Sequence, residues 1–210
     1  NLMQAGFPVV GFRRHDREEF VRQGGKALEA PAEGARAASM ILLCLPGEDA
    51  ELEVLEGRAG ILQALTADHT VIEMGTYRKA FKLEQAAKIT AKGAQALEAE
   101  ISGSPPMVVS RKAAIYAGGD PTVFQSCMPV LEAITPTIFH LGEYGSAVAM
   151  KLIANYLLSI HTLAAAEAMN LGARAGFDPQ LVAEVIQKGA GGSAMFGVRA
   201  PLMAARKFSP

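Results

Sequence analysis

Short apolar runs alternate with helical patterns up to Gly142, and this alternation restricts the fold more than any other feature of the chain. Runs suited to β-strands occupy residues 8–13, 27–28, 40–45, 70–74, 95–98, 113–117 and 137–141. Helical stretches separate most of them, the first opening with a capping-box pattern at Asp16 and Glu19; we expect an irregular loop between 98 and 113. The alternation predicts an α/β fold, a mostly parallel, Rossmann-like sheet covered by helices on both faces.

The pattern changes after Gly142, where no further strand is expected. A long apolar helix runs from Gly145 to about residue 175, Asp178 and Pro179 start a second helix, and a glycine-rich stretch at 189–192 precedes a third. The sequence therefore predicts an α/β domain over residues 1–142. An all-α domain over residues 143–210 follows, opening with a long interdomain helix.

Composition limits the partners that the chain can have. With 20 basic and 21 acidic residues among 210, the near-neutral charge gives no reason to expect nucleic acid or an anionic membrane as a partner. Two isolated cysteines and four scattered histidines predict neither a disulfide framework nor a metal site, so we expect a cytoplasmic protein. The run from 145 to 166 approaches membrane-spanning length, but Lys151, Asn155 and His161 within it favour a buried helix of a soluble protein.

Lys151 and Asn155 are the strongest candidates for chemistry. They lie four residues apart in a helix that is otherwise apolar all round, so the ammonium and the amide share one face. Burial disfavours a charged ammonium and can bring the pKa of a lysine toward neutrality, where it exchanges protons readily. The alternative is that Lys151 extends its long stem to water and has only a structural role.

The residues around this pair carry a family resemblance that extends along the whole chain. Residues 142–155 read G-x-x-G-x-x-x-x-x-K-x-x-x-N, residues 40–46 form an apolar strand ending in Leu-Pro, and residues 71–76 resemble the motif V-I-D-M-S-T. Ser102 and Gly103 match a D-x-x-V-S-G-G loop. Together these motifs resemble the β-hydroxyacid dehydrogenases, the 3-hydroxyisobutyrate dehydrogenase-like branch of the 6-phosphogluconate dehydrogenase superfamily. The resemblance implies that residues 1–142 are a dinucleotide-binding domain whose first strand and glycine-rich loop lie before residue 1. It also implies that the helical domain, for substrate binding and dimerisation, continues past residue 210.

The resemblance implies a role for each matching residue. Lys151 is expected to be the general acid and base, with Asn155 orienting the substrate hydroxyl, while Ser102 and Gly103 bind the substrate carboxylate. The cofactor-binding residues would be Leu45, Pro46 and Thr76. Two other interpretations stay open: Ser102-Gly103 is only a turn, and Thr76 only caps the helix that follows it. The chain departs from the family at Gly75, where serine is usual, and between Ser104 and Arg111, which leaves the identity of the substrate open.

Arg13 and Arg14 follow the strand at 8–13, where dinucleotide folds distinguish their two cofactors. An acidic residue there binds the ribose of NAD, whereas arginine meets the 2′-phosphate of NADP. Two guanidinium groups without an acid favour NADP over NAD. The alternative is a solvated basic turn that leads into Asp16.

These observations predict an NAD(P)-dependent hydroxyacid dehydrogenase. The expected reaction is hydride transfer between NAD(P) and a small β-hydroxy acid such as 3-hydroxyisobutyrate. We expect a homodimer or homotetramer, because the family pairs through its helical domain. Two alternatives remain: an enzyme similar to the imine reductases, which typically carry another residue at the lysine position, and a non-catalytic nucleotide-binding or scaffold protein that retains the fold.

Overall fold

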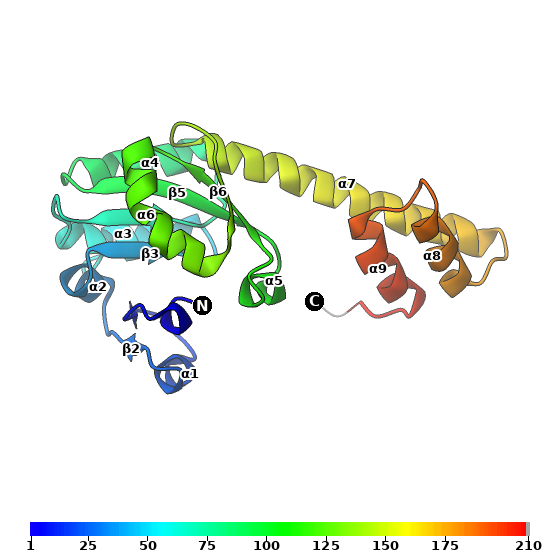
Figure 1. Cartoon of the computed structure of the whole chain (residues 1–210), viewed down its shortest axis with the longest axis horizontal. Coiled ribbons are helices and arrows are strands. Elements are labelled where there is room, and N and C mark those ends of the chain that lie inside the picture. Colours follow the sequence, from blue (N-terminus) through cyan, green and yellow to red (C-terminus); the bar gives the residue numbers. More distant parts are fainter. Residues whose placement is uncertain (209–210) are drawn as a thin grey trace. The chain divides into compact units, whose positions relative to one another are not determined.

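The computed structural model describes residues 1–208, and the chain divides into two compact units (Figure 1). The first unit is Asn1–Lys151 and the second is Leu152–Pro210. The first is an α/β unit and the second is helical, so the predicted fold class is confirmed.

The first unit is built on a five-stranded sheet in the order β3-β4-β5-β6-β7. Its strands are β3 (Met40–Leu43), β4 (Thr70–Glu73), β5 (Gln95–Ser102), β6 (Ala114–Gly118) and β7 (Thr137–His140). All neighbouring pairs are parallel except β5 and β6. Strands β1 (Val10–Gly11) and β2 (Lys26–Ala27) form a separate parallel pair. The sheet is therefore mostly parallel, as the sequence predicts.

Helices cover both faces of this sheet. The helices of the first unit are η1 (Met3–Ala5), α1 (Arg17–Arg22), α2 (Pro31–Ala37), α3 (Glu48–Glu56), η2 (Ile61–Gln63), α4 (Lys79–Thr90), α5 (Pro105–Val109) and α6 (Pro121–Ile134). On one face Ile72 and Leu97 pack with Leu131 of α6. On the other face Val71 packs with Leu55 of α3, Ile89 of α4 and residues of α2. Successive strand residues point to opposite faces, so each strand contributes to both layers.

Two local predictions are wrong. Asp16 has a left-handed backbone (φ 56°) and, within the described residues, makes no capping bond to α1; its carboxylate pairs with Arg13 instead. The predicted irregular loop after Glu98 contains the end of β5 and the short helix α5. Pro105 occupies the first turn of α5, where a fixed φ and a missing N–H cost nothing, so this proline starts a helix instead of interrupting one.

The second unit holds most of α7 (Ser146–Arg174) together with α8 (Pro179–Lys188) and α9 (Ala194–Ala204). Asp178 and Ser193 accept hydrogen bonds from the first backbone N–H groups of α8 and α9, which explains where these helices begin. A small core joins the three helices through Met169, Val182 and Phe196.

The sequence predicts that helix α7 is buried, and the structure shows that it is largely exposed. Large apolar side chains along it are exposed, among them Ile153, Tyr156 (66 % exposed), Leu157 and Leu163. By length and composition alone, α7 would be long enough to cross a membrane, with 11 % of its most apolar window buried. The prediction failed because an apolar sequence on all sides of a helix indicates only that the helix needs a covering partner, and the described residues of this chain do not cover it.

Candidate active site

Lys151 is fixed to the carboxyl end of β5. Its Nζ donates a hydrogen bond of 2.6 Å to the carbonyl oxygen of Ile101, and the residue is half-buried. Burial lowers the pKa of Lys151, and the nearby Glu100 carboxylate opposes that change. The ammonium is therefore held at the carboxyl end of β5 and does not extend freely into water.

The helix that carries Lys151 is anchored on the same strand. Glu98 Oε1 accepts hydrogen bonds from the backbone N–H groups of Gly145 (2.6 Å) and Ala147 (2.7 Å), at the start of α7. These N–H groups have no partner within the helix and form the positive end of its dipole, so a carboxylate there is favourable. Gly145 has φ +96°, and an added Cβ would lie 2.7 Å from Lys79 Cε, which explains the glycine.

Thr76 faces the same strand from the loop after β4. Its Oγ1 donates a 2.6 Å hydrogen bond to Glu100 Oε2. Helix α4 begins at Lys79 with Arg78 at its N-cap position. The interpretation of Thr76 as a helix cap is therefore wrong, and its hydroxyl is bound to a buried carboxylate.

Lys82 of α4 connects this loop to the sheet. It is fully buried, and its Nζ lies 2.7 Å from Glu73 Oε2, 2.9 Å from the Gly75 carbonyl oxygen and in direct contact with Glu100. Burial alone would lower the pKa of Lys82, but the adjacent Glu73 and Glu100 carboxylates outweigh it and raise the pKa. Lys82 therefore stays charged and binds the loop and both strands.

Carboxyl groups outnumber this lysine in the buried layer between the sheet and helices α3 and α4. Glu51, Glu73, Glu98 and Glu100 are all buried there. Desolvation raises the pKa of Glu51 to about 8 and also raises the pKa values of Glu73 and Glu98. Both oxygens of Glu51 lack a hydrogen-bond partner in the described structure. Part of this layer is therefore protonated near neutral pH.

This buried layer was not predicted from the sequence, although the sequence carries one signal for it. Counting back from Ser102 along the motif D-x-x-V-S-G-G places Glu98 on the family aspartate. Glu100, two residues later, lies on the same face of the strand. Lys82 carried no such signal, because a lysine in a charged helix reads as exposed.

The predicted cofactor loops Leu45-Pro46 and Gly75-Thr76 follow the adjacent parallel strands β3 and β4. Tyr77 joins them, its hydroxyl donating to the Leu45 carbonyl oxygen at 3.0 Å. A Cβ on Gly75 would lie 2.3 Å from the Tyr77 hydroxyl oxygen, which explains glycine where the family commonly has serine. The two loops thus form one unit at the carboxyl edge of the sheet, where doubly wound folds bind nucleotides.

Ser102 and Gly103 close β5 directly after the carbonyl that binds Lys151. Ser102 is half-buried and Gly103 exposed, and a Cβ on Gly103 would lie 2.8 Å from Ala113 Cβ. The pair is a tight turn next to Lys151, a geometry compatible with both interpretations of these residues. Arg111 donates to the Glu132 carbonyl oxygen at 2.7 Å, so its guanidinium is already bound to the protein.

The remaining predicted site residues are Arg13, Arg14 and Asn155, of which the two arginines lie apart from this cluster. Arg13 and Arg14 follow β1 on the surface, where Arg13 pairs with Asp16 at 3.3 Å and Arg14 with Glu53 of α3. Asn155 lies one helical turn beyond Lys151 in α7 and is half-buried. Both arginines are exposed, so their ion pairs are weak enough to open for an anionic ligand.

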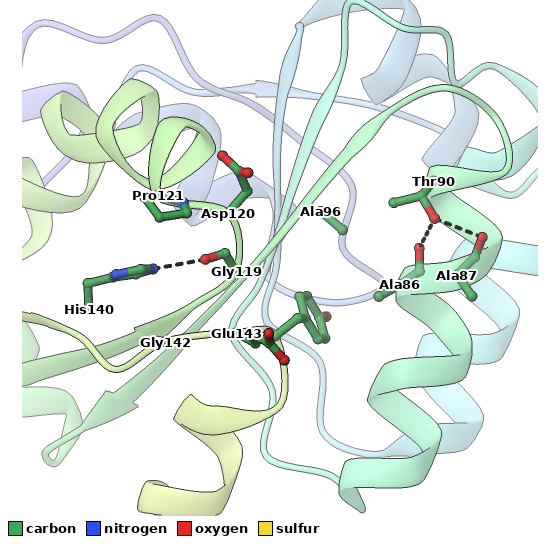
Figure 2. Close-up of a pocket in the computed structure, with 11 residues that line it drawn as sticks. Ala86, Ala87, Thr90, Ala96, Gly119, Asp120, Pro121, His140, Gly142 and Glu143 are labelled. Atoms are coloured by element: carbon green, nitrogen blue, oxygen red, sulfur yellow. Dashed lines mark hydrogen bonds between the residues drawn. The ribbon is translucent and has the colours of Figure 1, made fainter.

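A cavity of about 520 Å³ lies at the opposite edge of the sheet, at the end of β6 and β7 (Figure 2). Its lining includes Gly119, Asp120 and His140. His140 Nε2 donates to the Gly119 carbonyl oxygen at 2.9 Å, and Asp120 caps α6. These polar groups are already used within the fold, and none of the predicted site residues lines this cavity.

Comparisons with known proteins identify both parts of the chain. Residues 1–142 match the NAD binding domain of 6-phosphogluconate dehydrogenase, and residues 145–210 match the NAD-binding domain of NADP-dependent 3-hydroxyisobutyrate dehydrogenase. An uncharacterized oxidoreductase of Synechocystis is 31 % identical over 100 % of this chain and 74 % of its own length. The mitochondrial 3-hydroxyisobutyrate dehydrogenase of Mus musculus is 30 % identical over 91 % of this chain and 58 % of its own length.

Solved structures agree with these relatives. The crystal structure of 3-hydroxyisobutyrate dehydrogenase from Salmonella typhimurium superposes with a TM-score of 0.88 at 25 % identity, covering 99 % of this chain and 74 % of that protein. The chain thus spans between 58 % and 74 % of the length of these three relatives. On these grounds the chain belongs to the 3-hydroxyisobutyrate dehydrogenase-like family of NAD(P)-binding oxidoreductases, within the 6-phosphogluconate dehydrogenase superfamily.

Proposed function

We propose that this protein transfers a hydride between NAD(P) and a small β-hydroxy acid of the 3-hydroxyisobutyrate type. The observation that carries the proposal is the position of Lys151. Its half-buried ammonium is bound to the carbonyl oxygen of Ile101, and Ile101 directly precedes Ser102 in β5. A lysine with a lowered pKa at this point can exchange the proton of a substrate hydroxyl.

The residues present fit a nicotinamide dinucleotide. The Leu45-Pro46 and Gly75-Thr76 loops, joined by Tyr77, offer backbone and hydroxyl groups at the nucleotide edge of the sheet. When bound, the nicotinamide supplies the hydride acceptor for oxidation and the hydride donor for reduction.

The protein's own residues position the substrate and move its proton. The Ser102 hydroxyl and the Gly103 N–H are donors suited to the substrate carboxylate. The Asn155 amide, one turn along α7, orients the hydroxyl. Neutral Lys151 accepts the hydroxyl proton at Nζ in oxidation, and protonated Lys151 returns it in reduction.

Replacing Lys151 by alanine tests this assignment. General acid and base catalysis contributes roughly 10²- to 10⁴-fold, so kcat in Lys151→Ala should fall by that factor. Circular dichroism and a fluorescence titration of NADPH should show an unchanged fold and cofactor affinity. Lys92→Ala, at an exposed lysine just after α4, is the matched control. An alanine variant at position 151 that keeps wild-type turnover on 3-hydroxyisobutyrate would rule out the proton-transfer role.

We further propose that NADP is preferred over NAD. Arg13 and Arg14 are exposed after β1 and pair only with surface carboxylates, so they are free to exchange those partners for a phosphate. Removing both guanidinium groups in Arg13→Gln/Arg14→Gln should weaken NADP binding by about tenfold or more and leave NAD binding nearly unchanged. Calorimetric titration with both cofactors measures this, with Arg22→Gln on α1 as the control. Tighter binding of NAD than of NADP by the wild type would contradict the proposal.

A further inference from the structure

Buried charged side chains bind the loop that carries Thr76, and the proposed function assigns them no role. Lys82 Nζ donates to the Gly75 carbonyl oxygen at 2.9 Å, and Glu73 Oε1 accepts from the Gly75 N–H at 2.6 Å. Glu100 Oε2 accepts from Thr76 Oγ1 at 2.6 Å. Because Lys82, Glu73 and Glu100 are almost fully buried, water cannot replace these contacts.

Glu100 also lies between this loop and the Lys151 contact. It immediately precedes Ile101, whose carbonyl oxygen binds Lys151 Nζ at 2.6 Å. Glu100 therefore contacts the Thr76 hydroxyl and the Lys82 ammonium through its carboxylate, and it precedes in sequence the residue whose carbonyl fixes Lys151.

We propose that Glu100, which contacts the Lys82 ammonium, is a positioning residue of the reaction: it fixes the Thr76 hydroxyl and places a carboxylate close to Lys151. This rests on the proposed function of Lys151. Glu100 does not touch the substrate and acts through the two residues that would. Its charge holds Lys151 in the protonated form over a wider pH range than burial alone would allow, since the carboxylate opposes the desolvation of the ammonium.

Lys82 is the cation in direct contact with Glu100, and the other titratable groups nearby, apart from Lys151, differ from it in charge. Close to Glu100 are Glu73 from β4, Glu98 from β5, and Tyr77, Tyr144 and Cys44 from the loops. None of these groups supplies a positive charge. The ammonium of Lys82 touches both Glu100 and Glu73, in a layer where desolvation raises the pKa values of Glu51, Glu73 and Glu98.

The test follows the titration of Lys151 directly and does not depend on turnover. In the wild type, the ¹³C signal of the Lys151 side chain is assigned by its loss in Lys151→Arg and then titrated. In Glu100→Gln the amide oxygen still accepts from Thr76, but the charge is gone. The Lys151 midpoint should then move to lower pH, and the rising limb of kcat/KM for oxidation should move with it. Below the wild-type midpoint, the fraction of neutral Lys151 should increase by roughly threefold or more.

Two further variants separate positioning from a structural effect. Glu73→Gln is the matched control, since it removes a buried negative charge from Lys82 but not the charge beside Lys151, and its Lys151 midpoint should stay at the wild-type value. Lys82→Met/Glu100→Met removes the ammonium together with the Glu100 carboxylate, and Glu73, whose pKa burial raises, can then take up a proton in place of its contact with Lys82. It should reproduce the lower midpoint and also raise the KM for the cofactor, because Thr76 loses its acceptor. This double variant carries the test if Glu100→Gln does not fold.

The outcomes are distinct. An unchanged Lys151 midpoint in a folded Glu100 variant, or an equal change in Glu73→Gln, would overturn the positioning role. A lowered midpoint in a protein that oxidises no β-hydroxy acid would instead overturn the proposed function and leave the electrostatic coupling between Glu100 and Lys151 established.

Discussion

Single residues in this protein have properties that their position along the sequence does not reveal, and Glu51 is the clearest case. It lies on α3, is 0 % exposed, and neither of its oxygens has a hydrogen-bond partner among the described residues. Desolvation, with help from Glu73, raises its pKa to about 8. Burial of this kind favours the protonated form of a carboxyl group.

The sign of the resulting pH dependence follows from linkage. The pKa of Glu51 in the folded state is about 8 and its ordinary value is 4.5, so the folded state holds the proton more tightly than the unfolded state does. Its contribution to stability is complete below pH 4.5 and is lost as the pH rises through 8. The free energy of unfolding should therefore fall across this interval.

Glu51→Gln should remove much of that loss. At pH 8 we expect the variant to be more stable than the wild type by on the order of 2 kcal/mol, about half of what the full pKa difference would give. Urea unfolding at pH 5 and pH 8 measures this, with Glu18→Gln at an exposed position of α1 as the control. A variant whose stability changes with pH as steeply as that of the wild type would show that Glu51 is not the titrating group.

At the scale of elements, β5 organises the site, and it also shows where sequence reasoning stops. The alternation of strands and helices was predictable because hydrophobic periodicity records which face of each element is covered. The predicted strand stopped at Glu98 because charged residues are rare inside sheets, yet β5 continues through Glu100 to Ser102. The charges are tolerated because Lys82, 18 residues away from Glu100 in sequence, packs against them, and no local pattern encodes that partner.

The candidate site was predictable to a similar extent. Lys151, Ser102 and Thr76 could be singled out because motif spacing preserves them, and the structure places all three around β5 or its neighbouring loop. The residues that hold them, Glu98, Glu100 and Lys82, became visible only in three dimensions. Burial decides their protonation, and burial depends on how elements distant in sequence pack together.

At the scale of the whole molecule, α7 carries more exposed apolar surface than a soluble chain normally leaves uncovered. We propose that a second copy of the chain covers it, giving the expected homodimer or a homotetramer. Lys151, Asn155 and His161 are costly inside a lipid bilayer, which favours protein over membrane as the covering partner.

Charged residues on this surface should separate the copies. Leu157→Glu/Ile160→Glu alters two exposed apolar positions of α7, and light scattering during gel filtration should change from a multiple of 22.1 kDa to the mass of one chain. Gln180→Glu, on an exposed position of α8, should leave the assembly intact. A wild-type mass of one chain across the micromolar range would contradict the proposal. Sedimentation of the wild type with phosphatidylcholine vesicles would point to a membrane instead.

The pairing of β4 with β5 has a consequence for how the chain folds. Glu73 lies directly opposite Glu98 in this parallel register, and like charges in such positions repel. Helix α4, which connects the two strands in sequence, carries the Lys82 that neutralises them. A one-residue slip would turn the carboxylates of one strand into the apolar layer under α6. The contacts within the segment from Thr70 to Ser102 therefore favour this register of β4 on β5. The facing carboxylates are neutralised only when α4 packs against both strands.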